Sequence, residues 1–342
     1  MNLVTGATGI LGSHVVLKLL QNNKPVIACK QKKSDLSKIE KLFSYFPEGE
    51  KLFRQIAWRE MDVNDVYSIE DALEGVETVY HCAGHVSFND KDRKKLFKIN
   101  ETGTSNVVTA CLNKKITALC YASTIATLNN SDYTQPIDEN VFWKLNGKES
   151  DYALSKYGAE REVWRGIEEG LNAVIVNPGI ILSPGFWNQS SSKLFTRCYN
   201  GNKFYTNGLA PYISAQDVAT VMIKLIEKKQ FANRYILVEG NYTFREIVDT
   251  ILVNFGKPKA TINANRFILN LARFFENLMS AFGGKEQLLS RNTINSAFHV
   301  QTYVNTKIKE AINYDFMPVN KVIKDICRIF EEERREYADK IL

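Results

Sequence analysis

A glycine-rich turn at the start of the chain constrains its fold more than any other feature. Gly6, Gly9 and Gly12 stand three residues apart, after the apolar pair Leu3-Val4 and before apolar residues at helical spacing. In a strand–turn–helix unit, such glycines permit the tight turn, let backbone approach a pyrophosphate, and let the helix pack closely on the strand. The helix N-terminus then offers free N–H groups to phosphates. The flanking pattern favours a dinucleotide site over an ordinary glycine-containing loop, with contacts expected from Gly6, Thr8, Gly9, Ile10, Leu11 and Gly12.

Short β-branched runs alternate with longer amphipathic segments from residue 1 to residue 180, a pattern typical of a parallel sheet covered on both faces. The expected strands are 2–5, 25–29, 53–58, 78–81, 117–123 and 173–177. The expected helices are 11–22, 34–45, 66–73, 92–113 and 151–169. The sequence therefore predicts an α/β fold with a doubly wound parallel sheet of the Rossmann type.

The pattern loosens after Gly179, where short helix-like and strand-like pieces interleave to the end of the chain. A smaller C-terminal substrate lobe, built on the strand ends, has this appearance. Segments 213–227 and 234–238 are expected to return to the sheet as a helix and a strand. We therefore assign 1–180 and 211–240 to the dinucleotide-binding domain, and 181–210 and 241–342 to the substrate lobe.

Composition narrows the class of protein. The 44 basic and 38 acidic residues give a charge of +6, too mild and too dispersed to indicate nucleic-acid binding. The six cysteines lack ligand-like spacing and the four histidines are dispersed, so we expect free, buried thiols and no metal site. No apolar run reaches membrane-spanning length, and the first strand leaves no room for a signal peptide. We expect a cytoplasmic protein that binds a small molecule.

Polar and turn-forming residues recur where the predicted strands end. They are His81-Cys82-Ala83-Gly84, Ser123-Thr124 and Asn177-Pro178-Gly179. In an open parallel sheet, ligands bind outside the carboxyl ends of the strands. Turn formation alone explains glycine and proline there, but it explains the Ser-Thr pair less easily. We therefore expect these strand ends to line a site.

Tyr152 and Lys156 stand four residues apart at the start of a predicted helix, so they lie one turn apart on the same face. A lysine on the stripe used for burial needs a reason, because an unpaired buried ammonium is costly. The ammonium favours the phenolate and lowers the tyrosine pKa, which makes the tyrosine a usable proton donor and acceptor. A hydroxyl of Ser123 or Thr124 could hold a substrate oxygen during hydride transfer. Alone, the pair is equally typical of a helix surface.

Together and in this order, these motifs resemble those of the extended short-chain dehydrogenase/reductase family, which includes NAD-dependent epimerases and dehydratases and dihydroflavonol reductases. The resemblance covers nearly the whole chain. The matched positions are residues 5–12 for the glycine motif, Asp62-Val63 for the adenine contact, Ala83-Gly84 after the fourth strand, Asn100 for the active-site asparagine, Tyr152 with Lys156, and Pro178-Gly179 on the nicotinamide side.

The resemblance implies four catalytic roles. Tyr152 is the general acid and base, and Lys156 lowers its pKa and holds the nicotinamide ribose. Thr124 orients the substrate oxygen, and Asn100 supports the proton path. The family's dehydratases carry acids directly after this threonine, whereas here Ile125-Ala126 follow, which disfavours a dehydratase.

The cofactor is expected to be NADP, with NAD as the alternative. NAD-preferring members place an acid at the end of the second strand, but this chain has Lys30 and Lys32 there, which could meet a 2′-phosphate. A solvated basic loop is the other explanation. The remaining expected cofactor contacts are Asp62, Val63, Cys82, Ala83, Gly84, Tyr152, Lys156, Asn177, Pro178 and Gly179.

The substrate is expected to contact His85, Val86 and Phe88 beyond the fourth strand, together with Ser123 and Tyr212. Segment 266–282 carries one apolar face, which predicts a helix packed in the lobe core, with a wall over an apolar substrate as the second interpretation and a dimer helix or membrane contact as others.

Three functions remain open at this point. The first is an NADP-dependent oxidoreductase acting on a secondary alcohol or ketone. The second is a sugar-nucleotide epimerase with tightly bound NAD, and the third is a non-catalytic regulator that senses NADP. The family often forms dimers through the helices predicted at 92–113 and 151–169, so we expect a homodimer.

Overall fold

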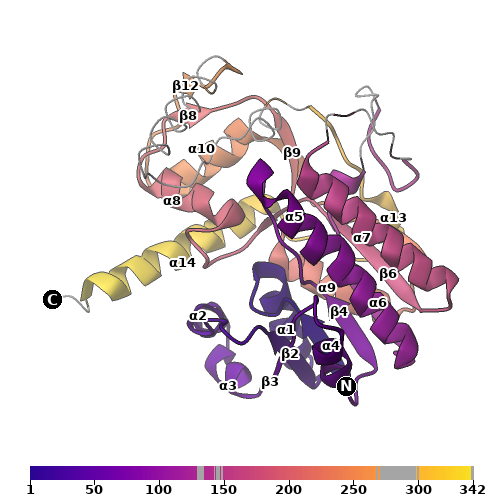
Figure 1. Ribbon diagram of the computed structural model, residues 1–342. Coiled ribbons are helices and arrows are strands. Elements are labelled where there is room, and N and C mark those ends of the chain that lie inside the picture. The colour runs from indigo at the N-terminus through magenta and orange to yellow at the C-terminus, as the bar shows by residue number, and fades with distance from the viewer. Residues whose placement is uncertain are drawn as a thin grey trace.

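A parallel sheet of seven strands forms the centre of the computed structural model (Figure 1). The structure describes residues 1–128, 135–141, 143, 147, 149–266, 269, 298 and 300–339. The strand order is β10-β6-β5-β4-β1-β2-β3, and every neighbouring pair is parallel. The strands are β1 (Asn2–Thr5), β2 (Val26–Lys30), β3 (Ala57–Glu60), β4 (Thr78–His81), β5 (Ala118–Ala122), β6 (Ala173–Pro178) and β10 (Asn233–Leu237). The predicted doubly wound sheet is confirmed.

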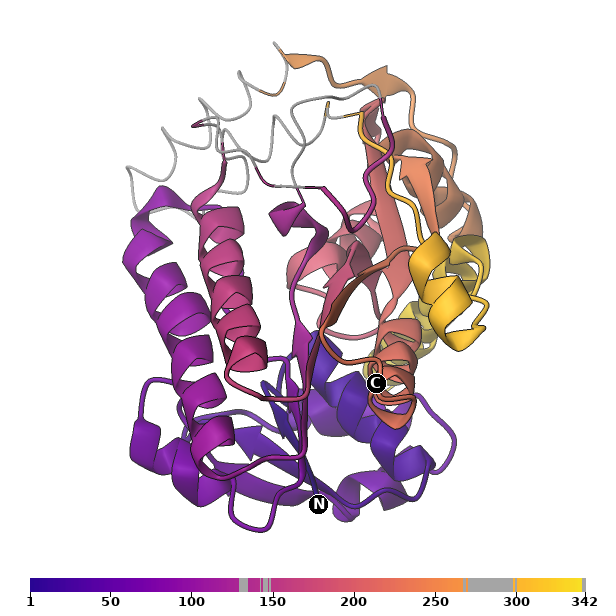
Figure 2. The same cartoon turned by 90° about the vertical axis from the view of Figure 1, so that its right-hand side faces the viewer.

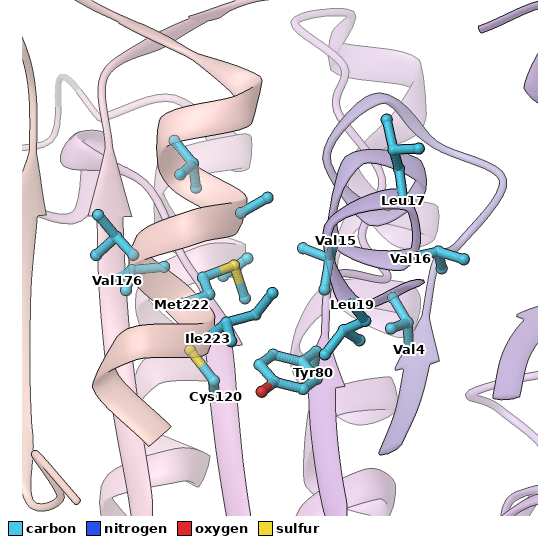
Figure 3. Packing of buried hydrophobic residues seen from close by; sticks show 14 of the residues in the cluster. Val4, Val15, Val16, Leu17, Leu19, Tyr80, Cys120, Val176, Met222 and Ile223 are labelled. Atoms are coloured by element: carbon cyan, nitrogen blue, oxygen red, sulfur yellow. The ribbon is translucent and has the colours of Figure 1, made fainter. Parts of the chain in front are cut away.

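Helices cover both faces of this sheet (Figure 2). One face carries α1 (Ile10–Gln21) and α9 (Ala215–Glu227), whose apolar side chains pack over the strands around Tyr80 and Val176 (Figure 3). The other face carries α4 (Val66–Ala72), α6 (Gly103–Asn113) and α7 (Asp151–Glu168). Because both faces are covered, the strands read as continuous apolar runs and not as alternating patterns.

The C-terminal lobe has a sheet of its own, in the order β11-β9-β7. Its strands are β7 (Ile180–Leu182), β9 (Leu209–Ser214) and β11 (Gly240–Thr243), and β8 (Phe204–Tyr205) pairs with β12 (Ile262–Asn263). Helices α8 (Lys193–Tyr199), α10 (Phe244–Asn254) and α14 (Val319–Asp339) enclose its core. Helix α13 (Thr306–Ile312) follows the lobe in sequence but packs with the core of the large sheet. The domain boundaries themselves stay a prediction.

Two predicted elements differ from the structure. The expected strand 53–58 begins only at Ala57, because Phe53 belongs to helix α3 (Gly49–Arg54) and its ring packs edge-on against Phe43 of α2 (Ser37–Ser44). The expected helix 92–113 is not uniform: a π-helical turn over Phe97–Thr102 separates α5 (Arg93–Leu96) from α6. Such turns often mark functional sites.

The apolar segment predicted at 266–282 lies outside the described residues, apart from Arg266 and Leu269. Within the described part of the chain, no helix is long and apolar enough to cross a membrane. The same residues contain no group of three or more histidines, cysteines or acids placed to hold a metal ion.

Candidate functional site

The glycine turn joins β1 to α1 by backbone contacts that exclude side chains. Gly6 has a φ of +63°, and a Cβ atom there would lie 2.6 Å from the Ala83 nitrogen. A Cβ atom on Gly12 would lie 2.2 Å from the Gly6 oxygen. Gly9 caps α1 in an extended conformation and, among the described residues, no side-chain hydrogen bond caps the helix N-terminus. The first N–H groups of α1 are thus left for a ligand, and this cradle fits the pyrophosphate of a dinucleotide.

A buried polar chain beneath the turn fixes the end of β4. The Thr5 hydroxyl lies 2.7 Å from His81 Nδ1 and accepts a hydrogen bond from the Ala83 N–H at 3.1 Å. His81 Nε2 lies 3.1 Å from the Thr104 hydroxyl. Burial, followed by the nearby Lys156, lowers the pKa of His81 to about 3, so the ring is neutral. No specific role was predicted for His81 from the sequence; its place at a strand end was the available signal.

Tyr152 lies in the first turn of α7, where the Ser150 hydroxyl caps the helix by accepting from the Ala153 N–H at 3.1 Å. Burial raises the pKa of Tyr152 to about 12, and a side-chain hydrogen bond with Thr124 opposes that shift. The Phe88 ring packs edge-on against the Tyr152 ring at 5.7 Å. The structure therefore brings together the predicted acid, its predicted hydroxyl partner and an apolar side chain.

Lys156 is buried one turn further along α7. Its Nζ donates to the Tyr121 hydroxyl at 2.5 Å and to the Ala122 carbonyl at 2.8 Å, and lies over the Tyr121 ring. Burial lowers the pKa of Lys156 to about 7. The expectation that this lysine lowers the pKa of Tyr152 is not met here, because burial dominates at both groups and the ammonium bonds to other oxygens.

Asn100 sits in the π-helical turn with its side chain fully buried. Its Oδ1 accepts from the His85 N–H at 2.7 Å, while its Nδ2 donates to the His85 carbonyl at 3.0 Å and the Ser155 hydroxyl at 2.9 Å. A Cβ atom on Gly84 would lie 3.4 Å from Asn100 Oδ1 and 3.9 Å from Lys156 Nζ. Asn100 thus ties the loop after β4 to α7, and its part in a proton path stays a prediction.

The predicted adenine contact lies against the first turn of α6. The Val63 carbonyl accepts from Asn106 Nδ2 at 2.9 Å, and a Cβ atom on Gly103 would lie 2.7 Å from the Val63 side chain. Asp62 accepts a hydrogen bond from the Asn64 N–H at 2.9 Å. This close packing places Asp62-Val63 at the carboxyl edge of the sheet, beyond β3.

Two predicted contact residues face inward instead. The Ser123 hydroxyl donates to Glu160 Oε1 at 2.5 Å, and Asn177 Nδ2 donates to the same oxygen at 2.6 Å. Both side chains are buried. A buried carboxylate must be hydrogen-bonded, and it draws these donors away from the cleft. Glu160 itself was not predicted as a site residue; its signal in the sequence was an acid one turn after Lys156.

The other predicted substrate residues divide in the same way. The prediction that Tyr212 lies at the cleft is wrong. Its side chain is 2% exposed and lies in the lobe core, near the Tyr242 ring. Val86 and Phe88 are exposed beyond β4, and their contact with a substrate stays a prediction. His85 lies 3.9 Å from the Asp92 carboxylate, and burial lowers its pKa.

The remaining cofactor positions lie along the same strand ends. Lys30 ends β2 with its ammonium 4.0 Å from the Glu60 carboxylate, and Lys32 is exposed just beyond. Burial raises the pKa of the Cys82 thiol to about 12, so it is not a thiolate. A Cβ atom on Gly179, after Pro178, would lie 2.6 Å from the Pro211 carbonyl. That glycine is needed where β6 passes into the lobe.

Comparison with known proteins agrees with this geometry. A model of the NAD dependent epimerase/dehydratase family matches residues 2–238. The chain belongs to this family. Its members are extended short-chain enzymes, both reductases and epimerases, for which an NAD(P) cofactor is typical.

The relatives of this family member are distant. Sterol demethylase protein B of Methylococcus capsulatus is 27% identical over 261 residues, 75% of each chain. A putative dihydroflavonol 4-reductase of Synechocystis is 26% identical, over 75% of this chain and 72% of its own length. Among solved structures, gox2253 has a TM-score of 0.80 at 24% identity, covering 97% of this chain and 98% of its own. UDP-glucose 4-epimerase of Thermus thermophilus has a TM-score of 0.74 at 18% identity, covering 96% and 98%. These structures share the fold.

Proposed function

We propose that this family member is an NADP-dependent oxidoreductase that acts on a secondary alcohol or ketone. The observation that carries the proposal is the Tyr152 phenol at the carboxyl edge of the sheet, with Thr124 close enough to oppose the rise in its pKa and with Lys156 one turn further along α7. NADPH, held over the glycine turn, would supply the hydride. Burial keeps Tyr152 protonated at neutral pH, since its pKa is raised to about 12, and this suits a proton donor to a carbonyl oxygen.

In this mechanism the substrate carbonyl lies between the two hydroxyls. Thr124 donates a hydrogen bond that orients the oxygen, and Tyr152 transfers a proton to it as the carbonyl carbon is reduced. Lys156 would hold the nicotinamide ribose and would place its ammonium near the phenol. Asn100 holds the loop that follows β4, at Gly84, close to this lysine.

An apolar substrate fits this site better than a sugar nucleotide. Phe88 is 45% exposed and Val86 is 55% exposed, and the Phe88 ring touches Tyr152. Exposed apolar side chains beside reacting groups are typical of small-molecule sites. The similar proteins named as a sterol demethylase component and a dihydroflavonol reductase bear names of apolar or aromatic compounds, which agrees with this substrate class.

Net redox turnover tests the proposal. With purified protein, NADPH and a panel of hydrophobic ketones, we expect steady oxidation of NADPH with stoichiometric alcohol formation, followed by absorbance at 340 nm and chromatography. The control panel is UDP-sugars with NAD. Interconversion of UDP-sugars without net change in cofactor would instead support an epimerase, and cofactor binding without turnover on either panel would support a regulator.

The cofactor preference is tested at Lys32, which is exposed and paired with no acid in the described part of the chain. We expect Lys32→Ala to raise the KM for NADPH about tenfold, because one charge-assisted hydrogen bond to a 2′-phosphate is lost. The KM for NADH should not change. Lys51→Ala, which removes an equally exposed lysine on α3, is the matched control. An equal effect on both cofactors would contradict NADP recognition by this loop.

A homodimer through α6 and α7 and a cytoplasmic location stay predictions.

A further inference from the structure

Behind the site, Glu160 is buried with three hydrogen-bond donors on one carboxylate oxygen. Its Oε1 accepts from the Ser123 hydroxyl at 2.5 Å, the Thr127 hydroxyl at 2.6 Å and Asn177 Nδ2 at 2.6 Å. The residue is 2% exposed. Hydrogen bonds to a carboxylate favour its charged form, and bonds to an ionised acceptor are the strong ones. Three donors therefore hold the Glu160 carboxylate inside the protein.

The donors come from three elements that build the site. Ser123 directly follows β5, Thr127 ends the short turn Ile125–Thr127, and Asn177 lies in β6. Thr124 stands between the first two, and its carbonyl accepts from the Thr127 hydroxyl at 2.8 Å. Glu160 thus ties helix α7 to the strand ends on either side of Thr124.

Lys156 is the buried cation one turn before Glu160 on the same helix. Its direct partners, the Tyr121 hydroxyl and the Ala122 carbonyl, are neutral. In the described part of the chain, no carboxylate oxygen lies within 4.0 Å of Lys156 Nζ, the distance that defines an ion pair. Burial lowers the pKa of this lysine, and the charge of Glu160 is the largest influence that raises it. The two groups are coupled through the protein interior, where charges interact strongly.

Charged and titratable groups face this pair from every neighbouring element. Around Lys156 they are Cys82 and His81 at the end of β4, Tyr121 on β5 and Tyr152 on α7; around Glu160 they are Tyr121 and, 3.9 Å from Oε2, the guanidinium of Arg234 on β10. His81 is neutral, and burial raises the pKa of Cys82, Tyr121 and Tyr152, so these groups are uncharged near neutral pH. Glu160 is thus the one anion among them.

We propose that Glu160 is a positioning residue whose buried negative charge favours the charged form of Lys156. The cation is then available to the nicotinamide ribose and to Tyr152 during proton transfer. This consequence for turnover rests on the proposed function, whereas the coupling between the two buried charges does not.

The first test measures the melting temperature of wild type, E160Q and E160D between pH 5.5 and 8.5. A lysine whose pKa is depressed on folding makes the folded state lose stability as the pH falls from 10.5 toward the folded pKa. Without Glu160 the pKa of Lys156 in the folded state falls further. The melting temperature of E160Q should therefore go on falling at pH values below those at which the melting temperature of wild type has stopped falling. The difference in melting temperature between wild type and E160Q, the deficit of E160Q, should therefore widen as the pH falls. The deficit of E160D, which keeps the charge, should stay constant. A constant deficit for E160Q overturns the proposal.

If E160Q does not fold, R234Q provides the test of opposite sign. This variant removes the cation that faces Glu160 and keeps the carboxylate, so the pKa of Lys156 should rise. The deficit of R234Q in melting temperature should then narrow as the pH falls. Arg234 also donates to the carbonyls of Glu139 and Val141, and its charge lowers the pKa of Lys307, so the comparison is made in a K307Q background, where that lysine does not titrate. A deficit of R234Q that does not change with pH also overturns the proposal.

The second test is the pH profile of kcat/KM for ketone reduction. For E160Q we expect the alkaline limb to move about one unit lower, and for E160D we expect the limb to stay in place. A purely structural role would lower the whole profile without moving the limb. If wild type reduces no ketone, the proposed function fails, while the melting temperatures still decide the role of Glu160.

Discussion

Tyr152→Phe should lower kcat/KM for ketone reduction about 10³-fold, which is within the usual contribution of a positioned general acid. The substitution removes the phenolic proton and the hydrogen bond with Thr124, but keeps the ring that packs against Phe88. The glycine turn lies on other elements, so the affinity for NADPH should change less than about twofold.

Steady-state kinetics and titration of NADPH fluorescence separate these two effects. Tyr157→Phe is the matched control, because it removes the same hydroxyl from the same helix, where the ring packs on Trp143 and not on the site. It should retain full activity. Retained turnover in Tyr152→Phe would remove Tyr152 from the mechanism.

Gly6→Ala should destabilise the protein by about 3 kcal/mol or more and abolish NADPH binding. Two costs add at this position. The backbone has a φ of +63°, which L side chains rarely adopt, and the new Cβ atom would lie 2.6 Å from the Ala83 nitrogen. The atoms that it meets are backbone, so β1 and the loop after β4 must move apart, and the cradle for the pyrophosphate opens.

Gly75→Ala is the control for Gly6→Ala. Gly75 also has a positive φ, +71°, but a Cβ atom there would meet nothing within 4 Å among the described residues. Its cost should be about 1 kcal/mol, from the backbone conformation alone. Urea denaturation of both variants gives the difference, which isolates the close approach of the two strand ends. Equal losses would contradict the tight packing at Gly6.

The sequence predicted the sheet because periodicity and turn chemistry act locally. Continuous apolar runs between helical patterns indicate buried parallel strands, and the glycine turn marks the first of them. The prediction of a strand at Phe53 was wrong because an aromatic residue favours strands in isolation, while here Phe53 lies in helix α3 and its ring packs against Phe43 of α2. Such packing between segments leaves no mark on local periodicity.

The same distinction between local pattern and packing separates the site residues that were predicted correctly from those that were not. Tyr152 and Lys156 lie on one helix, and Thr124 follows strand β5 beside them, so spacing and strand order sufficed to group them. Ser123 was expected to face the substrate from the same strand end, but its hydroxyl turns to Glu160. Which of two adjacent hydroxyls faces a cleft depends on where a buried acid lies, and spacing does not report that.

By itself, the amino-acid sequence determined the fold class, the phosphate cradle and the tyrosine–lysine pair, because each follows from short-range rules of turn, helix and strand. Only the tertiary structure decided the direction of the individual side chains. It buried Tyr212 in the lobe, held Asn100 against His85 and placed Glu160 among three donors. The physical reason is that desolvation forces buried polar groups to find partners, and those partners come from segments far apart in the chain.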